Sequence, residues 1–150
     1  MHTISFPKYN FKIKDEDGKS FIFDELRKKW IILTPEESVR QHLWMYLHKE
    51  KNYPISHMAC EKTIKVNSLN KRFDLMIYDR SGTPFLIAEC KAPNIKLDQK
   101  VLDQVLRYNI AIKCKYVIIT NGIDIYCCNI DFSNAKISFL NEIPLYLKNS

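Results

Sequence analysis

Glycine is scarce in this chain of 150 residues, which contains only Gly18, Gly82 and Gly122. A phosphate-binding loop of the G-x-x-x-x-G-K-[ST] kind needs two glycines at a fixed separation, followed by lysine and a hydroxyl residue. No pair of the three glycines has that separation. The sequence therefore excludes a nucleotide-driven motor of that class within these residues.

Paired cysteines and long apolar runs are also lacking. The five cysteines are an odd number and include no C-x-x-C pair, which argues against a disulfide framework and a zinc ribbon. We therefore expect free thiols in a reducing compartment. Runs such as "WIIL" and "YVIIT" are too short to cross a bilayer, and the N-terminus shows no apolar signal segment. We expect a soluble cytoplasmic protein with no membrane partner.

The composition is that of a folded domain, with 46% apolar and 27% charged residues. A chain of this length suffices for one domain with a single core. Lys and Arg number 23 against 17 Asp and Glu, so the formal net charge is +6. This excess favours an anionic partner, but only weakly, because many soluble proteins carry such a charge.

The first half of the chain predicts a hairpin, then a long helix. Residues 8–23 read as a hairpin around the turn "DEDGKS". The segment "TPEE" is a strong helix start, because Thr34 can cap, Pro35 suits the first turn, and Glu37 completes a capping box. We expect this helix to continue to about Lys51, before the proline of "KNYP".

The rest of the chain predicts strands on both sides of a second helix. We expect strands at 60–66, 72–79 and 84–91, a helix at 97–113 with a Val101, Val105, Tyr108 and Ile112 stripe, strands in "KYVIIT", "DIYCCNI" and "KISFL", and a terminal helical turn at 141–148. This order indicates an α/β fold, bordering on α+β, with a mixed sheet flanked by helices. We expect one domain over 1–150, with an N-terminal annex at 1–33 and a core at 34–145.

The stretch "PFLIAECKAP", residues 84–93, places two charges at the end of an apolar strand. Side chains two apart on a strand share a face, so Glu89 and Lys91 emerge together. An even turn centred on Ser81 and Gly82 would pair Asp79 with Pro84 and Asp74 with Glu89. The pattern therefore predicts two opposed carboxylates with a lysine beside them.

Opposed carboxylates require neutralisation. Directly paired residues have Cβ atoms about 5 Å apart, where like charges are destabilising. A shared proton or a cation removes the repulsion, and a hard divalent ion is well matched to carboxylates, a backbone carbonyl and waters. Lys91 could then steady a water nucleophile or offset the charge of a phosphate. The alternative is that Asp74 and Glu89 are edge-strand charges paired with Arg72 and Lys91.

The strand "RFDLMIYD" followed by "ECK" resembles the D…E-x-K signature of the PD-(D/E)XK nuclease superfamily. The segments "TPEESVRQHL", "KRFDLMIYDRSGTPFLIAECKAP", "QVLRYN" and "VIITNGIDIYCC" together resemble the N-terminal nuclease domain of type I restriction enzyme R subunits, over roughly residues 24–145. Phe73 stands where the signature proline would precede Asp74, and we expect no helicase motor within these 150 residues. The resemblance implies a restriction-endonuclease-like fold.

The resemblance also implies a Mg²⁺-dependent DNA endonuclease, with Mn²⁺ as a substitute ion. The metal would be held by Asp74, Glu89, the Cys90 carbonyl and Glu37, and the catalytic residues would be Asp74, Glu89, Lys91 and Gln104. Glu37 has a competing role in the capping box, and Gln104 could instead satisfy a core carbonyl. Glu36 is the weaker ligand candidate, being out of step with the E-x-x-R pattern of Glu37 and Arg40.

The expected partner is DNA. Contacts with it are expected from Arg72, Tyr108, Lys62, Lys65 and Arg107, which engage phosphates rather than read bases. The resemblance adds motor or specificity subunits as partners and leaves a homodimer open. A non-catalytic DNA-binding or assembly module of the same fold is the alternative to a nuclease.

Overall fold

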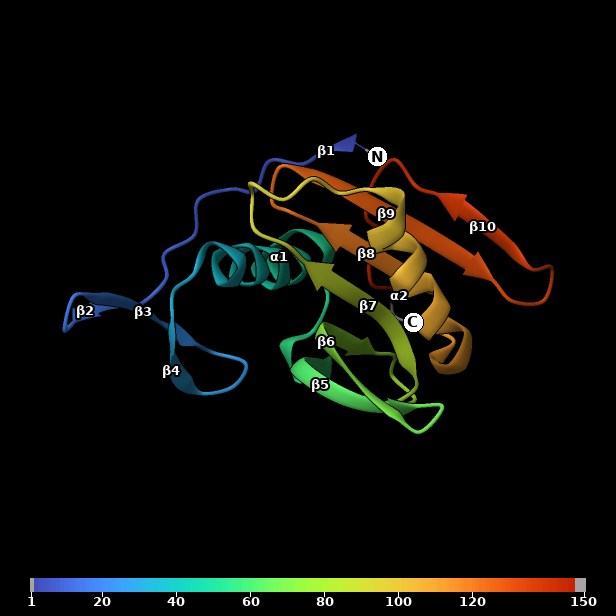
Figure 1. Cartoon of the computed structure of the whole chain (residues 1–150), viewed down its shortest axis with the longest axis horizontal. Helices are drawn as coiled ribbons and strands as arrows, with labels where there is room; N and C mark the ends of the chain where they lie inside the picture. Colours follow the sequence, from blue (N-terminus) through green and yellow to red (C-terminus); the bar gives the residue numbers. More distant parts are fainter. Residues whose placement is uncertain (1, 148–150) are drawn as a thin grey trace.

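The structure, a computed structural model, describes residues 2–147 (Figure 1). Its strands are β1 (His2–Thr3), β2 (Ile13–Glu16), β3 (Lys19–Asp24), β4 (Lys29–Ile32), β5 (Met58–Val66), β6 (Leu69–Tyr78), β7 (Pro84–Cys90), β8 (Tyr116–Thr120), β9 (Asp124–Asp131) and β10 (Lys136–Phe139). Its helices are α1 (Pro35–Lys51), the 3₁₀ turn η1 (Ile55–His57) and α2 (Gln99–Ile112).

The main sheet is mixed and has seven strands within the described residues. Its order is β1-β9-β8-β7-β6-β5, and β10 also pairs with β9. The β7–β8 pair is parallel, whereas its neighbours β6–β7 and β8–β9 are antiparallel. The predicted fold class, a mixed central sheet flanked by helices, is confirmed.

The two helices cover opposite faces of this sheet. Strand β7 is buried along nearly its whole length, and strand alternation divides its side chains between two apolar clusters. Ala88 joins the cluster that contains Leu43 of α1, whereas Ile87 joins the cluster that contains Val105 of α2. The end of β7 is therefore enclosed from both sides, which is why a charge placed there is buried.

Helix α1 begins and ends as predicted. The Thr34 side chain accepts a hydrogen bond from the Glu37 N–H, with Pro35 in the first turn, and Asn52 ends the helix at a φ of 65°. The predicted stripe of α2 faces the core, with Val105 buried and Val101, Tyr108 and Ile112 half-buried against the same cluster. The helix also buries Leu102 and Asn109, which the predicted stripe did not include.

The N-terminal annex is larger than the predicted hairpin. Strands β2 and β3 meet at the "DEDGKS" turn, where Asp17 and Gly18 have φ values of 52° and 76°. Strand β4 adds a third member that we did not predict, and the first strand, β1, pairs with β9 of the main sheet. We call the β2–β3–β4 sheet the annex sheet.

The C-terminal segment, the cysteines and the helix lengths were also subjects of prediction. The predicted helical turn at 141–148 is wrong for residues 141–147, which form no helix, and residue 148 lies outside the described residues. The five cysteines are free thiols, all but Cys60 fully buried. In the part of the chain that the structure describes, no helix is long and apolar enough to cross a membrane.

Candidate active site

The β6–β7 turn differs from the expected even turn. Asp79 N–H donates to the Thr83 carbonyl, so residues 80–82 form the turn, and Tyr78 rather than Asp79 pairs with Pro84. An irregularity between Ile77 and Tyr78 then shifts the register back, and Leu75 pairs with Ala88 as the even turn would require. The turn and the irregularity shift the register in opposite directions and so cancel. Asp74 and Glu89 are the next residues along the two strands, beyond the Leu75–Ala88 pair.

Glu89 is a buried carboxyl group with an unused oxygen. The residue is 8% exposed, and its Oε1 has no hydrogen-bond partner among residues 2–147. Burial raises the pKa of Glu89 to about 7, and the charge of Asp74 raises it further, while Lys71 and Lys91 act in the opposite direction. Near neutral pH this carboxyl group is thus close to half-protonated and open to a cation.

Asp74 has partners for both of its oxygens. Its Oδ1 accepts from Nη2 of Arg40 at 2.9 Å, and its Oδ2 accepts from the Cys90 N–H at 2.6 Å. The second bond ties the carboxylate to the end of β7, next to Glu89. The alternative pairing of Asp74 with Arg72 is not the ion pair that forms.

Arg40 is the centre of a buried charge cluster. Its Nη1 donates to Glu37 at 2.8 Å, and its Nη2 lies 2.7 Å from Oε1 of Glu61. The side chain is 7% exposed, and the charges of Asp74, Glu37 and Glu61 raise its pKa. Each carboxylate offsets part of the cost of burying the guanidinium.

The Glu37 carboxylate binds two arginines, while its backbone N–H takes part in the cap of α1. Its carboxylate accepts from Arg27 at 2.7 Å as well as from Arg40, and it is 4% exposed. Arg27 in turn pairs with the fully buried Asp24 of the annex sheet. The backbone half of the predicted capping box forms, but the Glu37 side chain joins the annex to α1.

Glu36 lies nearer to the candidate site than the sequence indicated. Burial raises the pKa of Glu36, as does the charge of Asp74, whereas Arg40 and Lys91 lower it. Glu36 also contributes to the raised pKa of Glu89. Its side chain is 47% exposed and lies 3.9 Å from Nη2 of Arg40, a longer approach than those of Glu37, Glu61 and Asp74 to the same arginine.

Lys91, Tyr108 and Gln104 differ in their surroundings. Lys91 follows β7, where its N–H donates to the Thr120 carbonyl, and its charge acts on both Glu36 and Glu89. Tyr108 stacks under the ammonium of Lys71, 5.1 Å from the ring centroid, so α2 lies beside β6. Gln104 is exposed, so it does not satisfy a carbonyl in the core.

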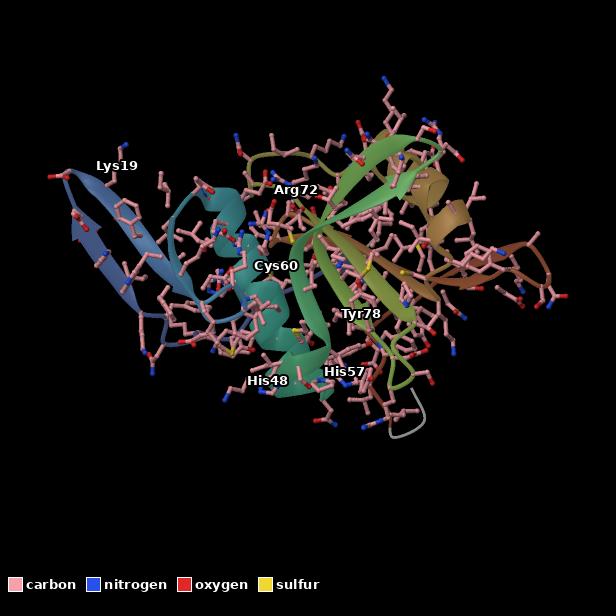
Figure 2. All side chains as sticks on the ribbon, turned by 90° about the horizontal axis from the view of Figure 1, so that it is seen from below. Lys19, His48, His57, Cys60, Arg72 and Tyr78 are labelled. Carbon is pink, nitrogen blue, oxygen red and sulfur yellow. The ribbon has the colours of Figure 1, made fainter. Side chains whose placement is uncertain are left out.

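The expected DNA contacts lie on β5, β6 and α2. Arg72 is 67% exposed and pairs with Oε2 of Glu61 at 2.7 Å; it lies on β6 opposite Thr63 of β5, and Figure 2 labels it. Lys62 and Lys65 are exposed on β5, and Arg107 is exposed on α2. Sequence reasoning missed Glu61 and the role of Lys71, and neither has a motif that would have revealed it.

The donor set suits a hard divalent ion in part. Among residues 2–147, no group of three or more His, Cys, Asp or Glu side chains is arranged to hold a metal. The carboxylates of Asp74 and Glu89 and the Cys90 carbonyl are nevertheless all oxygen donors, which Mg²⁺ prefers. The unpartnered, buried Oε1 of Glu89 fits such an ion.

Comparisons with known proteins agree with this fold. A family model described as the type I restriction enzyme R protein N terminus (HSDR_N) matches residues 35–144. A solved fragment assigned as an HsdR subunit of a type I restriction enzyme from Vibrio vulnificus superposes with a TM-score of 0.56 at 20% identity. The match covers 75% of this chain but 24% of that one. A comparison with curated proteins gave no match.

Proposed function

The chain belongs to the family of type I restriction enzyme R protein N-terminal domains, and on this premise we propose that it is a Mg²⁺-dependent deoxyribonuclease of the PD-(D/E)XK kind. The observation that carries the proposal is the buried, unpartnered carboxyl oxygen of Glu89 beside Asp74. An uncompensated buried carboxylate is costly, so its retention at a strand end favours a ligand.

Asp74, Glu89 and the Cys90 carbonyl would hold the ion, with Glu36 as a further carboxylate in place of Glu37, which is bound by Arg27 and Arg40. Bound there, Mg²⁺ or Mn²⁺ supplies Lewis-acid activation of a phosphate and of a water. Lys91 contributes a positive charge beside Glu89, where it can orient a water or stabilise negative charge that develops on the phosphate. Gln104, exposed on α2, would contact a DNA phosphate or Lys91.

DNA is the proposed substrate and partner, and Arg72, Lys62, Lys65 and Arg107 are the proposed phosphate contacts. Arg72 would exchange Glu61 for a phosphate at little cost, because Arg72 is 67% exposed and Glu61 keeps its ion pair with Arg40. Tyr108, with the Lys71 ammonium over its ring, is a further proposed DNA contact, where ring and lysine would act together. Motor or specificity subunits, or a second copy of the chain, would deliver DNA to the site.

The test combines metal binding with cleavage. Mg²⁺ or Mn²⁺ should raise the Tm of the wild type by several degrees, because a ligand of the native state stabilises it, and Asp74→Asn should lose this response. Plasmid and single-stranded DNA should be cut with metal and not with EDTA. Lys91→Ala should lower cleavage by roughly 100-fold or more while the metal affinity, measured by calorimetry, stays close to wild type.

Lys136→Ala removes an exposed lysine on β10 and is the matched control, with unchanged cleavage expected. Equal metal affinity in the wild type and Asp74→Asn would remove the metal site from the proposal.

The second candidate, a DNA-binding or assembly module, is favoured by one observation, since both Asp74 oxygens already have partners within the chain. DNA binding without cleavage under any metal would support it.

A further inference from the structure

One face of the annex sheet carries two ordered cross-strand rows. Lys14 of β2 pairs with Phe21 of β3, which pairs with Ile32 of β4. In the second row Phe23 pairs with Trp30. The Phe23 N–H donates to the Lys12 carbonyl at 2.9 Å, which extends the ladder to Lys12. Each row therefore reads lysine, phenylalanine, large apolar residue. We call this surface, made of Lys12, Lys14, Phe21, Phe23, Trp30 and Ile32, the aromatic–lysine face.

The lysines of this face lie over its rings. The Lys14 ammonium is 4.6 Å from the Trp30 ring centroid and 5.9 Å from that of Phe21, and the Lys12 ammonium is 5.7 Å from that of Phe23. Trp30 is 40% exposed and Ile32 is 48% exposed. Exposed rings with cations above them combine a stacking surface with positive charge.

Strand alternation separates the charges of the annex sheet. Asp15 and Asp24 point to the other face, together with the buried Ile22. Two acids lie at the turn end of the aromatic–lysine side, Glu16, which pairs with Lys14 at 3.3 Å, and Asp17. A hollow of about 340 Å³ opens at this end, lined by Lys14, Glu16, Asp17, Lys19, Phe21 and Trp30. Lysines thus gather with the rings while two of the aspartates lie behind the sheet.

The aromatic–lysine face is distinct from the candidate active site. Figure 2 shows Lys19 at the tip of the annex sheet, well away from Arg72 on β6. The family match begins at residue 35 and leaves the annex sheet outside it. The site's metal ligands and Lys91 all lie on the main sheet or α1, so the rows of the annex have no part in the proposed chemistry.

We propose that the aromatic–lysine face binds single-stranded nucleic acid, with unstacked bases on Trp30 and its neighbouring rings and phosphates on Lys12 and Lys14. Surfaces that bind single strands combine a positive groove with aromatic side chains, and every base offers a π-face to such a ring. The bases of a duplex are already stacked on one another and leave the rings unused. A protein partner fits less well, because lysine is depleted at protein interfaces.

The two tryptophans allow a direct test in EDTA, where no cleavage complicates binding. Trp30 is exposed, whereas Trp44 is 1% exposed and donates to Gln41 within α1. Titration of the full chain with an oligothymidylate of about 10 nucleotides should quench fluorescence from Trp30 alone. Trp30→Phe should remove the quenching yet keep most of the affinity, measured by anisotropy of a labelled oligonucleotide.

Trp30→Ala should weaken binding by roughly tenfold or more, and Lys14→Gln should reduce the salt dependence of the affinity. Ile13→Ala, which changes an exposed residue on the opposite face, is the matched control and should bind like the wild type.

Two results would overturn the proposal. One is binding detected by anisotropy without quenching of Trp30 fluorescence, and the other is equal affinity in Trp30→Ala and the wild type. A concentration-dependent dimer that Trp30→Ala abolishes would overturn it too, since the face would then be a protein interface. Because the test needs no metal, loss of the nuclease proposal leaves its outcome unaffected.

Discussion

Glu89 and Arg40 show at the scale of single residues how the site balances its charges. Asp74 takes its hydrogen bonds from Arg40 and from the backbone of β7, whereas Glu89 keeps a buried oxygen without a partner in the described part of the chain. The two neighbouring carboxyl groups are thereby made unequal. One is hydrogen-bonded to an arginine, and the other is left with a raised pKa and capacity for a cation.

The raised pKa of Glu89 makes stability depend on pH. Its folded pKa of about 7 lies above the ordinary 4.5, so between these values the native state binds a proton that the unfolded state releases. The free energy of unfolding should therefore fall as pH rises through this window in EDTA. Glu89→Gln should flatten that decline and be more stable than the wild type at pH 8, by roughly 1–3 kcal/mol.

Urea denaturation of both proteins at pH 5 and pH 8 measures this difference. Glu142→Gln, a change at a residue that is 85% exposed, is the control and should follow the wild-type curve. Parallel pH profiles for Glu89→Gln and the wild type would show that burial does not destabilise the Glu89 anion.

At the scale of elements, β5 departs from regular pairing where it faces the site. Cys60 pairs with Leu75 and Lys62 with Phe73, but the intervening Glu61 has a φ of 56° and is left out of the ladder with Asp74. A left-handed backbone at a non-glycine residue is strained. Here the left-handed backbone coincides with the ion pairs that Glu61 makes with Arg40 and Arg72. Glu61 therefore makes these ion pairs where it leaves the regular pairing of β5 with β6.

Two substitutions separate this backbone strain from the ion pairs. Glu61→Ala and Glu61→Gly both delete the carboxylate, but only glycine adopts the left-handed region without a Cβ clash. Glu61→Gly should be more stable than Glu61→Ala by about 0.5–1 kcal/mol, after the greater unfolded-state entropy of glycine is subtracted from the strain. Thermal unfolding in EDTA measures the difference, and a more stable alanine variant would contradict the strain.

At the scale of the whole molecule, Arg27 connects the annex sheet to the helix that supports the site. It pairs with Asp24, which is fully buried, and with Glu37 of α1 at 2.7 Å. Through Glu37 the connection continues to Arg40 and then to Asp74. In Figure 1 the annex sheet extends from one end of the molecule, and this buried charge chain is what we expect to hold it there.

Arg27→Ala should destabilise the protein by about 2–4 kcal/mol, because it leaves Asp24 and Glu37 buried without their cation. Lys28→Ala is a matched control, since it removes the neighbouring positive charge from an exposed pair with Glu25 and should change stability by less than about 0.5 kcal/mol. Denaturation followed by tryptophan fluorescence and by circular dichroism gives both values. Equal stability of the two variants would show that the annex is held by other contacts.

Local signals in the sequence determined most of the helices and strands and the order of charges along them. Thr34 and Pro35 place the start of α1, and alternation with apolar runs places the strands, because capping and periodicity depend on residues a few positions apart. The pairing of Leu75 with Ala88 was also anticipated, although through a turn of the wrong length whose error an irregularity at Tyr78 cancels.

Only the tertiary structure decided which charges meet. Arg40 draws together Glu37, Asp74 and Glu61 from a helix and two strands, and Glu36 rather than Glu37 remains available near the site. The burial of Leu102 and Asn109 on α2 and the third strand of the annex were likewise set by packing partners distant in sequence. Electrostatic contacts and burial act through space, so no local pattern specifies them, whereas capping, turns and periodicity act along the chain and can be read from it.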